Sequence, residues 1–175
     1  MLRMLRKIAR TGVVTEAPPD SPGPVLESVG ERLCATLVRR FAGCLAIRQV
    51  DAGSCNGCEL EIQALNNPFY AIERFGVHFV ASPRHADLLL VTGPVSRHME
   101  AALRATYEAM PEPRLVIAVG DCGADGGEFG VSYASCGAVA NVLPVDGVIR
   151  GCPPDPMQLT LGLLEVLRKA TRGQA

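Results

Sequence analysis

Four of the seven cysteines in this chain lie at positions where they could bind one metal centre. Cys55 and Cys58 are separated by two residues, a spacing at which two thiolates can reach the same metal centre. Cys122 follows the strand-like run 115–121, and Cys152 follows the run 148–151 and precedes two prolines. Because thiolates bind both zinc and iron–sulfur clusters, the four cysteines predict one metal centre of either kind.

The segments around these cysteines alternate between strand and helix patterns. We expect strands at 45–50, 77–81, 87–93, 115–119 and 145–150, and helices at 26–41, 59–75 (interrupted near Pro68), 97–110 and from 156 onward. This alternation predicts a three-layer α/β fold with a mainly parallel sheet. Sites in such sheets form outside the carboxyl ends of the strands, where Cys55, Cys122 and Cys152 fall. The glycine-rich stretch 121–134 is expected to be a loop.

Several features favour an iron–sulfur cluster over zinc. Zinc sites usually combine two tight pairs of ligands, whereas here one pair is joined by two distant single cysteines. The step Cys152-Pro153 is typical of ferredoxin-type ligation. Glycines beside Cys58, Cys122 and Cys152 allow the backbone to approach a bulky inorganic group. A redox dithiol at Cys55 and Cys58 is a third interpretation, which leaves the other two cysteines unexplained.

The remaining cysteines are predicted to lie outside the ligand set. Cys34 falls in an apolar helical pattern, and Cys44 begins a strand, so both are interpreted as small core residues. Cys136 follows the glycine-rich stretch and is also placed outside the set. Glu59 and Glu61 stand beside the cysteine pair at a helix start. They could relay protons or contact a partner, or they could simply be acidic residues favoured by the helix dipole.

Composition excludes several classes of function. The chain has 175 residues, a net charge of -1, 5% aromatic residues and no Trp, which argues against nucleic-acid binding. A P-loop lysine and a Gly-x-Gly-x-x-Gly motif are both missing, so no nucleotide site is expected. An odd number of cysteines without a secretory apolar segment indicates reduced thiols in the cytoplasm. We find no apolar run approaching 18 residues and therefore expect no membrane span.

Two segments are predicted along the chain. Residues 1–24 form an N-terminal segment with a basic amphipathic helix at 1–10 and a proline-rich linker, and residues 25–175 form the iron–sulfur domain. The helix could dock on a membrane surface or in a partner's groove, or it could be a solvated terminus.

Taken together, several stretches carry a resemblance to a known family: 10–16, 51–59, 81–87, 91–95, 118–122 and 151–154. With them the chain resembles the small, electron-transfer subunit of membrane-bound, energy-converting nickel–iron hydrogenases of the formate hydrogenlyase and hydrogenase-four types. It is also similar to the homologous 20 kDa subunit of respiratory complex I.

The resemblance implies a flavodoxin-like fold and one [4Fe-4S] cluster held by Cys55, Cys58, Cys122 and Cys152. It implies three kinds of partner: a nickel–iron large subunit or a homologue that lacks nickel, a ferredoxin-like cluster subunit, and the membrane subunits of the complex. The chain would relay electrons between the ferredoxin-like subunit and the large subunit. It would lie peripherally on the cytoplasmic face of the cell membrane, because the twin-arginine leader of periplasmic relatives is not found here.

Two alternatives stay open. Complex I proteins typically have two adjacent cysteines where this chain has the separated pair Cys55 and Cys58, so the hydrogenase branch is favoured. The alternative within the family is a subunit of an NADH–quinone oxidoreductase that passes electrons to quinone. The alternative of another class is a zinc-stabilised scaffold that only binds partners.

Overall fold

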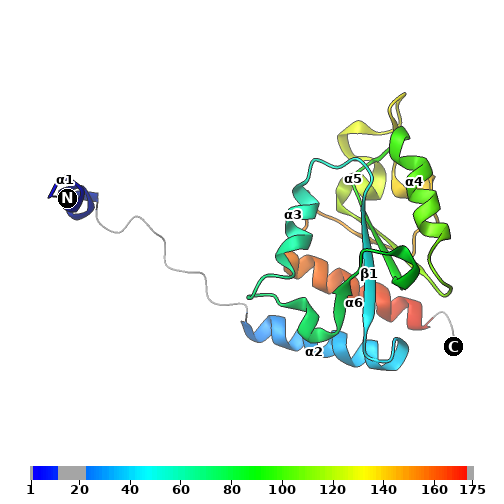
Figure 1. Ribbon diagram of the computed structural model, residues 1–175, viewed down its shortest axis with the longest axis horizontal. Helices are drawn as coiled ribbons and strands as arrows, with labels where there is room; N and C mark the ends of the chain where they lie inside the picture. Colours follow the sequence, from blue (N-terminus) through cyan, green and yellow to red (C-terminus); the bar gives the residue numbers. More distant parts are fainter. Residues whose placement is uncertain (1, 12–22, 173–175) are drawn as a thin grey trace.

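The computed structural model describes residues 2–11 and 23–172 (Figure 1). The helix expected at 1–10 is present as α1, Leu2–Thr11. The predicted proline-rich linker falls for the most part on 12–22 and so lies outside the described residues. None of the helices in the described ranges has the length and apolar content that crossing a bilayer requires.

A parallel sheet forms the centre of the molecule. Within the described residues it has five strands, in the spatial order β2 (Val77–Phe79), β1 (Leu45–Asp51), β3 (Leu88–Thr92), β5 (Leu115–Val119) and β7 (Gly147–Ile149). All neighbouring strands pair in parallel. Counted along this sheet alone, the order is 2-1-3-4-5, which is that of flavodoxin-like folds. The predicted three-layer α/β fold is therefore confirmed.

Helices cover both faces of the sheet (Figure 1). One face packs against α2 (Gly23–Arg40), α3 (Gly57–Ala64) and α6 (Pro156–Arg172), and the other packs against α4 (Arg97–Glu108) and its neighbours. Successive side chains of β3 alternate between the two layers: Leu88 and Leu90 join the first core, and Leu89 and Val91 join the second. A strand buried in this way on both faces explains the continuous apolar run that the sequence shows.

The two predicted helix caps are present. Ser96 Oγ accepts a hydrogen bond from the backbone N–H of Met99 at 3.3 Å, which begins α4. Asp155 Oδ1 accepts from the N–H of Gln158 at 2.8 Å, and Gln158 Oε1 accepts from the N–H of Asp155 at 3.0 Å. This reciprocal pair is a capping box at the start of α6.

Two local expectations are wrong in part, and one element was not expected. The helix expected over 59–75 is interrupted near Pro68 as predicted, but α3 already ends at Ala64 and only a 3-10 turn at Ile72–Phe75 takes the place of the second helical piece. Asn67 Oδ1 then accepts backbone hydrogen bonds from Phe69 and Tyr70, and this turn competes with helix continuation. The glycine-rich stretch expected to be a loop begins with a helix, α5 (Gly120–Asp125). A small antiparallel sheet of β4 (Val95–Ser96) and β6 (Ser135–Gly137) was not foreseen. The described residues also contain 3-10 turns at Ile72–Phe75, Pro83–His85, Gly127–Phe129 and Val139–Asn141.

Candidate metal centre

The structure brings Cys55, Cys58, Cys122 and Cys152 into one pocket of about 110 Å³. Ser54, Gly57, Gly93, Asp121, Gly151 and Pro153 complete its lining. The pocket lies beyond the carboxyl ends of the strands, at the end of the sheet where β1 leads toward α3 and where α5 begins (Figure 1). Cys58 is buried and Cys122 is half-buried, whereas Cys55 and Cys152 are exposed, so the pocket opens onto the surface.

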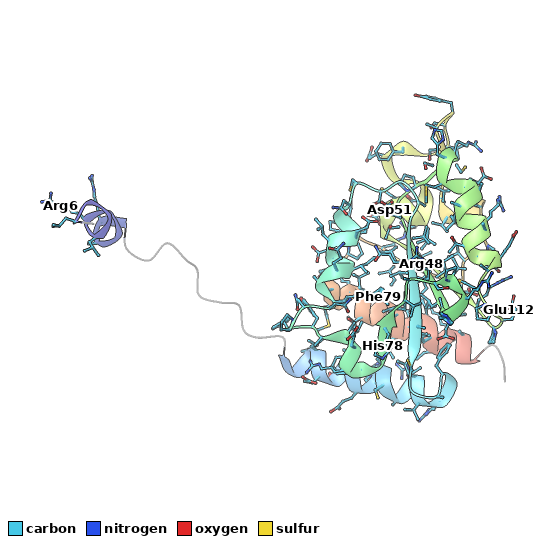
Figure 2. All side chains as sticks on the ribbon, viewed as in Figure 1. Arg6, Arg48, Asp51, His78, Phe79 and Glu112 are labelled. Atoms are coloured by element: carbon cyan, nitrogen blue, oxygen red, sulfur yellow. The ribbon has the colours of Figure 1, made fainter. Side chains whose placement is uncertain are left out.

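The segment that carries the first two cysteines is shaped by its own backbone hydrogen bonds. Asp51, at the end of β1 (Figure 2), accepts hydrogen bonds from the N–H groups of Gly53 at 2.9 Å and Ser54 at 2.8 Å. This Asx turn reverses the chain directly after the strand. Asn56 then takes a left-handed conformation, with φ 72°, immediately before α3. As a result, Cys55 lies in the loop and Cys58 lies in the first helical turn.

Gly120 brings the third cysteine close to this loop. It has φ +80°, and a Cβ placed on it would lie 2.7 Å from Cys58 Sγ. A residue with a side chain would therefore require either that the Cys58 thiol turn away or that α5, and with it Cys122, move away from Cys58. Gly127 also packs closely against a cysteine: a Cβ placed on it would lie 2.8 Å from Cys122 Sγ.

The segments that carry Cys122 and Cys152 are tied to one another. The N–H of Asp121 donates to the carbonyl of Gly151 at 2.9 Å, and the N–H of Gly151 donates to Asp121 Oδ1 at 3.2 Å. The Arg150 guanidinium donates to Asp125 Oδ2 at 3.0 Å, from the residue after β7 to the end of α5. These contacts fix the last cysteine relative to the third.

Two of the four thiols, those of Cys58 and Cys122, have raised pKa values. Burial raises the pKa of Cys58 to about 12, and the negative charges of Glu59 and of the other three cysteines contribute to the same shift. The pKa of Cys122 is also raised, first by burial and then by Cys152 and Cys55. Ionising the thiols of Cys58 and Cys122 is therefore unfavourable until a cationic centre compensates their charge, and binding such a centre would release protons from them.

The lining of the pocket suits a bulky thiolate-bound group. The donors are sulfur atoms, and Gly57, Gly93 and Gly151 leave the backbone close to the space between them. A single water needs roughly 15 Å³ of such volume, so the pocket has room for more than one ion. As the side chains stand, no three His, Cys, Asp or Glu residues of the described ranges are grouped closely enough to hold one metal ion. The thiols thus surround a space and do not converge on a point.

The other cysteines do not line this pocket. Cys34 is half-buried in α2, and Cys44 is exposed just before β1, so the interpretation of Cys44 as a core residue is wrong. Cys136 is buried in β6, where its thiol donates to Glu100 Oε2 at 3.3 Å. That hydrogen bond and the surrounding core account for Cys136 without a metal.

Glu59 and Glu61 also lie outside the pocket lining. Glu59 is only 5% exposed, and both of its carboxylate oxygens lack a hydrogen-bond partner among the described residues. Glu61 is half-buried. A buried carboxylate without a partner is unusual and marks Glu59 as the more informative of the two.

Residues that sequence reasoning missed surround the site. Asp121 lines the pocket and ties two cysteine-bearing segments, and the only signal for it was its position directly before Cys122. The stretch after α5 exposes three large apolar side chains: Phe129 is 66% exposed, Val131 69% and Tyr133 98%. These three residues, which we call the apolar rim, follow Gly127 in the chain, and it is Gly127 whose Cβ would lie close to Cys122 Sγ.

Comparison with known proteins identifies the family. The model of the family described as NADH ubiquinone oxidoreductase, 20 kDa subunit, matches residues 55–166. The chain belongs to this family. The predicted resemblance is therefore confirmed, and the family's members include subunits of oxidoreductase complexes.

Two similar proteins are named as subunits of a formate hydrogenlyase and of a probable membrane-bound hydrogenase. Formate hydrogenlyase subunit 7 of Escherichia coli is 40% identical over 158 residues, which cover 85% of this chain and 62% of that protein. The match thus spans less than two thirds of that relative. A probable membrane-bound hydrogenase subunit of Pyrococcus furiosus is 44% identical over 128 residues, covering 71% of this chain and 77% of that one.

Solved structures agree on the fold. A chain of an archaeal membrane-bound sulfane sulfur reductase matches with a TM-score of 0.67 and 31% identity, covering 82% of this chain and 78% of that chain. A chain of the nickel–iron–selenium hydrogenase of Dm. baculatum matches with a TM-score of 0.50 and 16% identity, covering 75% and 64%. The second likeness concerns the fold alone.

Proposed function

We propose that this chain is an electron-transfer subunit that carries one [4Fe-4S] cluster on Cys55, Cys58, Cys122 and Cys152. In this proposal it relays electrons between a ferredoxin-like subunit and the nickel–iron large subunit of a membrane-bound hydrogenase complex. The observation that carries the proposal is the pocket in which these four cysteines, brought from three different strand ends, face a common space.

Two features support a cluster over a mononuclear zinc site. A tetrahedral zinc ion draws four sulfurs to about 2.3 Å from one point, whereas these thiols are spread around a pocket of about 110 Å³. Glycines at the pocket wall also leave room for backbone N–H groups to approach inorganic sulfide. When bound, such a cluster supplies a site that accepts and releases single electrons.

The chain's own residues would hold that site near the surface. Buried Cys58 anchors one side, and the bonds of Asp121 to Gly151 hold the segments of Cys122 and Cys152 together. Exposed Cys55 and Cys152 leave the other side accessible. A redox partner that docks over this opening could bring its own centre close to the cluster.

The apolar rim supports a partner that contacts the stretch after α5. Phe129, Val131 and Tyr133 are exposed at alternate positions of one short stretch, and several exposed large apolar side chains in one segment favour an interaction site. We assign this surface to the large subunit. The names of the relatives, a formate hydrogenlyase subunit and a probable membrane-bound hydrogenase subunit, support an assembly of this kind. In our proposal the chain lies peripherally on the cytoplasmic face of the cell membrane, beside the membrane subunits of the complex.

Glu59 is proposed as a proton relay toward the large subunit. Its buried carboxylate follows Cys58 directly and has both oxygens free of hydrogen bonds in the described chain. Replacing Glu59 with Gln should leave the iron content unchanged and slow the proton-coupled turnover of the complex. Replacing half-buried Glu61 with Gln is the matched control, and it should have the smaller effect.

The second candidate function is electron transfer to quinone in a complex I-type oxidoreductase. It is favoured by the description of the family, which names an NADH ubiquinone oxidoreductase subunit. Hydrogen-dependent reduction of a dye by the purified complex separates the two functions: activity is expected for the hydrogenase assembly and none for the quinone-reducing one.

Metal analysis tests the cluster itself. The full chain, purified without oxygen, should contain about four irons and four sulfides and little zinc. The variants Cys122→Ser and Cys152→Ser should lose the iron, while Cys34→Ala, a change at a cysteine outside the pocket, should keep it. One zinc per chain, with failed reconstitution by iron and sulfide, would instead establish the zinc-stabilised scaffold.

A further inference from the structure

Helix α1 separates apolar from basic residues along its length. On a helix of about 3.6 residues per turn, positions 2, 5 and 9 fall within roughly 60° of one another, and positions 6 and 10 adjoin them. The first three are Leu2, Leu5 and Ala9, and the other two are Arg6 and Arg10. Leu2 is 86% exposed and Leu5 60%, and Arg6 projects outward from the helix (Figure 2).

The charge of α1 is opposite to that of the remaining chain. Residues 2–11 contain four basic residues and no acidic one. The whole chain has 17 basic and 18 acidic residues, which leaves 13 basic and 18 acidic outside α1, a net charge of -5. An anionic surface would therefore repel the rest of the chain and attract this helix.

We propose that α1 is an interfacial helix that binds an anionic lipid surface. The exposed leucines can insert into the apolar layer of a bilayer, and the basic residues beside them can contact the negatively charged headgroups above that layer. An acidic protein groove would also attract the charge, but the lipid surface accommodates both sides of the helix along its whole length. This binding is independent of the cluster and adds a direct lipid contact to the proposed role in a membrane complex.

The chain has no tryptophan, so a single introduced indole reports on α1 without background. The full-length Leu5→Trp variant should show a blue shift of its emission with vesicles that contain phosphatidylglycerol, and none with pure phosphatidylcholine. Val38→Trp, at a position that is 61% exposed on α2, is the matched probe and should show no shift with either vesicle.

Vesicle sedimentation of the full chain tests the charge. Arg6→Gln with Arg10→Gln should lower partitioning onto phosphatidylglycerol vesicles about 30-fold, from about 1 kcal/mol for each charge near the surface. Arg39→Gln with Arg168→Gln makes the same charge change on α2 and α6 and should leave partitioning near that of the unmodified chain.

Three results would overturn the inference: no sedimentation of the unmodified chain, equal binding to neutral vesicles, or unchanged binding of the Arg6/Arg10 variant. A different result would show that α1 binds a protein groove. In that case the unmodified chain would not bind vesicles, and the Arg6/Arg10 variant would fail to assemble into the complex. Iron analysis of the same samples distinguishes a failure of this inference from a failure of the proposed function. A sample that keeps its iron but does not bind vesicles contradicts only the inference about α1.

Discussion

Replacing Gly120 with Ala should disrupt the metal centre much more than it lowers the stability of the fold. Gly120 has φ +80°, a conformation in which a residue with a Cβ costs about 1–2 kcal/mol. The new Cβ would also lie 2.7 Å from Cys58 Sγ, closer than a carbon and a sulfur tolerate. In the metal-free chain the thiol can turn to another rotamer, so this second effect adds little to the stability cost.

A thiolate that holds a metal centre cannot turn away in the same manner. Gly120→Ala should therefore lose most of its iron, although the chain still folds. Gly43→Ala is the matched control: Gly43 has φ +91°, and its Cβ would meet only Val38 Cγ2 at 3.8 Å. Both variants should lower the melting temperature of the metal-free chain by about 2–8 °C, as expected for 1–2 kcal/mol in a chain of this size.

The assay combines thermal melts of the metal-free chains, followed by circular dichroism, with iron analysis after anaerobic reconstitution. Similar melting temperatures with iron lost only from Gly120→Ala are expected. Full iron content in Gly120→Ala, or equal loss from Gly43→Ala, would refute the reasoning that Gly120 makes room for the ligand at Cys58.

Three further predictions follow from the packing and the charges. Burial, reinforced by nearby negative charge, raises the pKa of Cys58 from 9.0 to about 12. The folded metal-free chain thus holds this proton more tightly than the unfolded chain, and its stability should fall as the pH rises from about 9 toward 12; melts of Cys58→Ala over the same range should show a smaller loss. In Arg150→Gln the pKa of Asp125, which the Arg150 hydrogen bond lowers, should rise toward its ordinary value in an NMR titration, while the melting temperature changes little because the pair is exposed. Leu90→Ala, at a fully buried position of β3, should cost about 2–5 kcal/mol in urea denaturation, and a loss under 1 kcal/mol would contradict the two-sided burial of this strand.

The sheet could be predicted because its signal is local and strong. The apolar runs that became β3 and β5 are buried at every position, and no helical period competes with them. Their parallel arrangement then followed from the alternation with helices. Since parallel strands end at a common edge, the grouping of Cys55, Cys122 and Cys152 could be expected from the sequence alone.

The structural features that could not be predicted from the sequence depend on contacts between segments that are distant in the chain. Helix α5 contains two glycines in six residues and has a poor intrinsic helix propensity. It is held in place by the backbone bond from Asp121 to Gly151, thirty residues away, which no local pattern encodes. The burial of Glu59 is of the same kind, because a carboxylate in a first helical turn is usually solvated.

Electron paramagnetic resonance of the full chain tests the central claim most directly. The chain, purified without oxygen and reduced with dithionite, should give one iron–sulfur spin per chain at low temperature. The signal should disappear in Cys122→Ser and persist in Cys34→Ala. A reduced chain that gives no spin and contains one zinc would contradict the account, and so would a signal of unchanged intensity in Cys122→Ser.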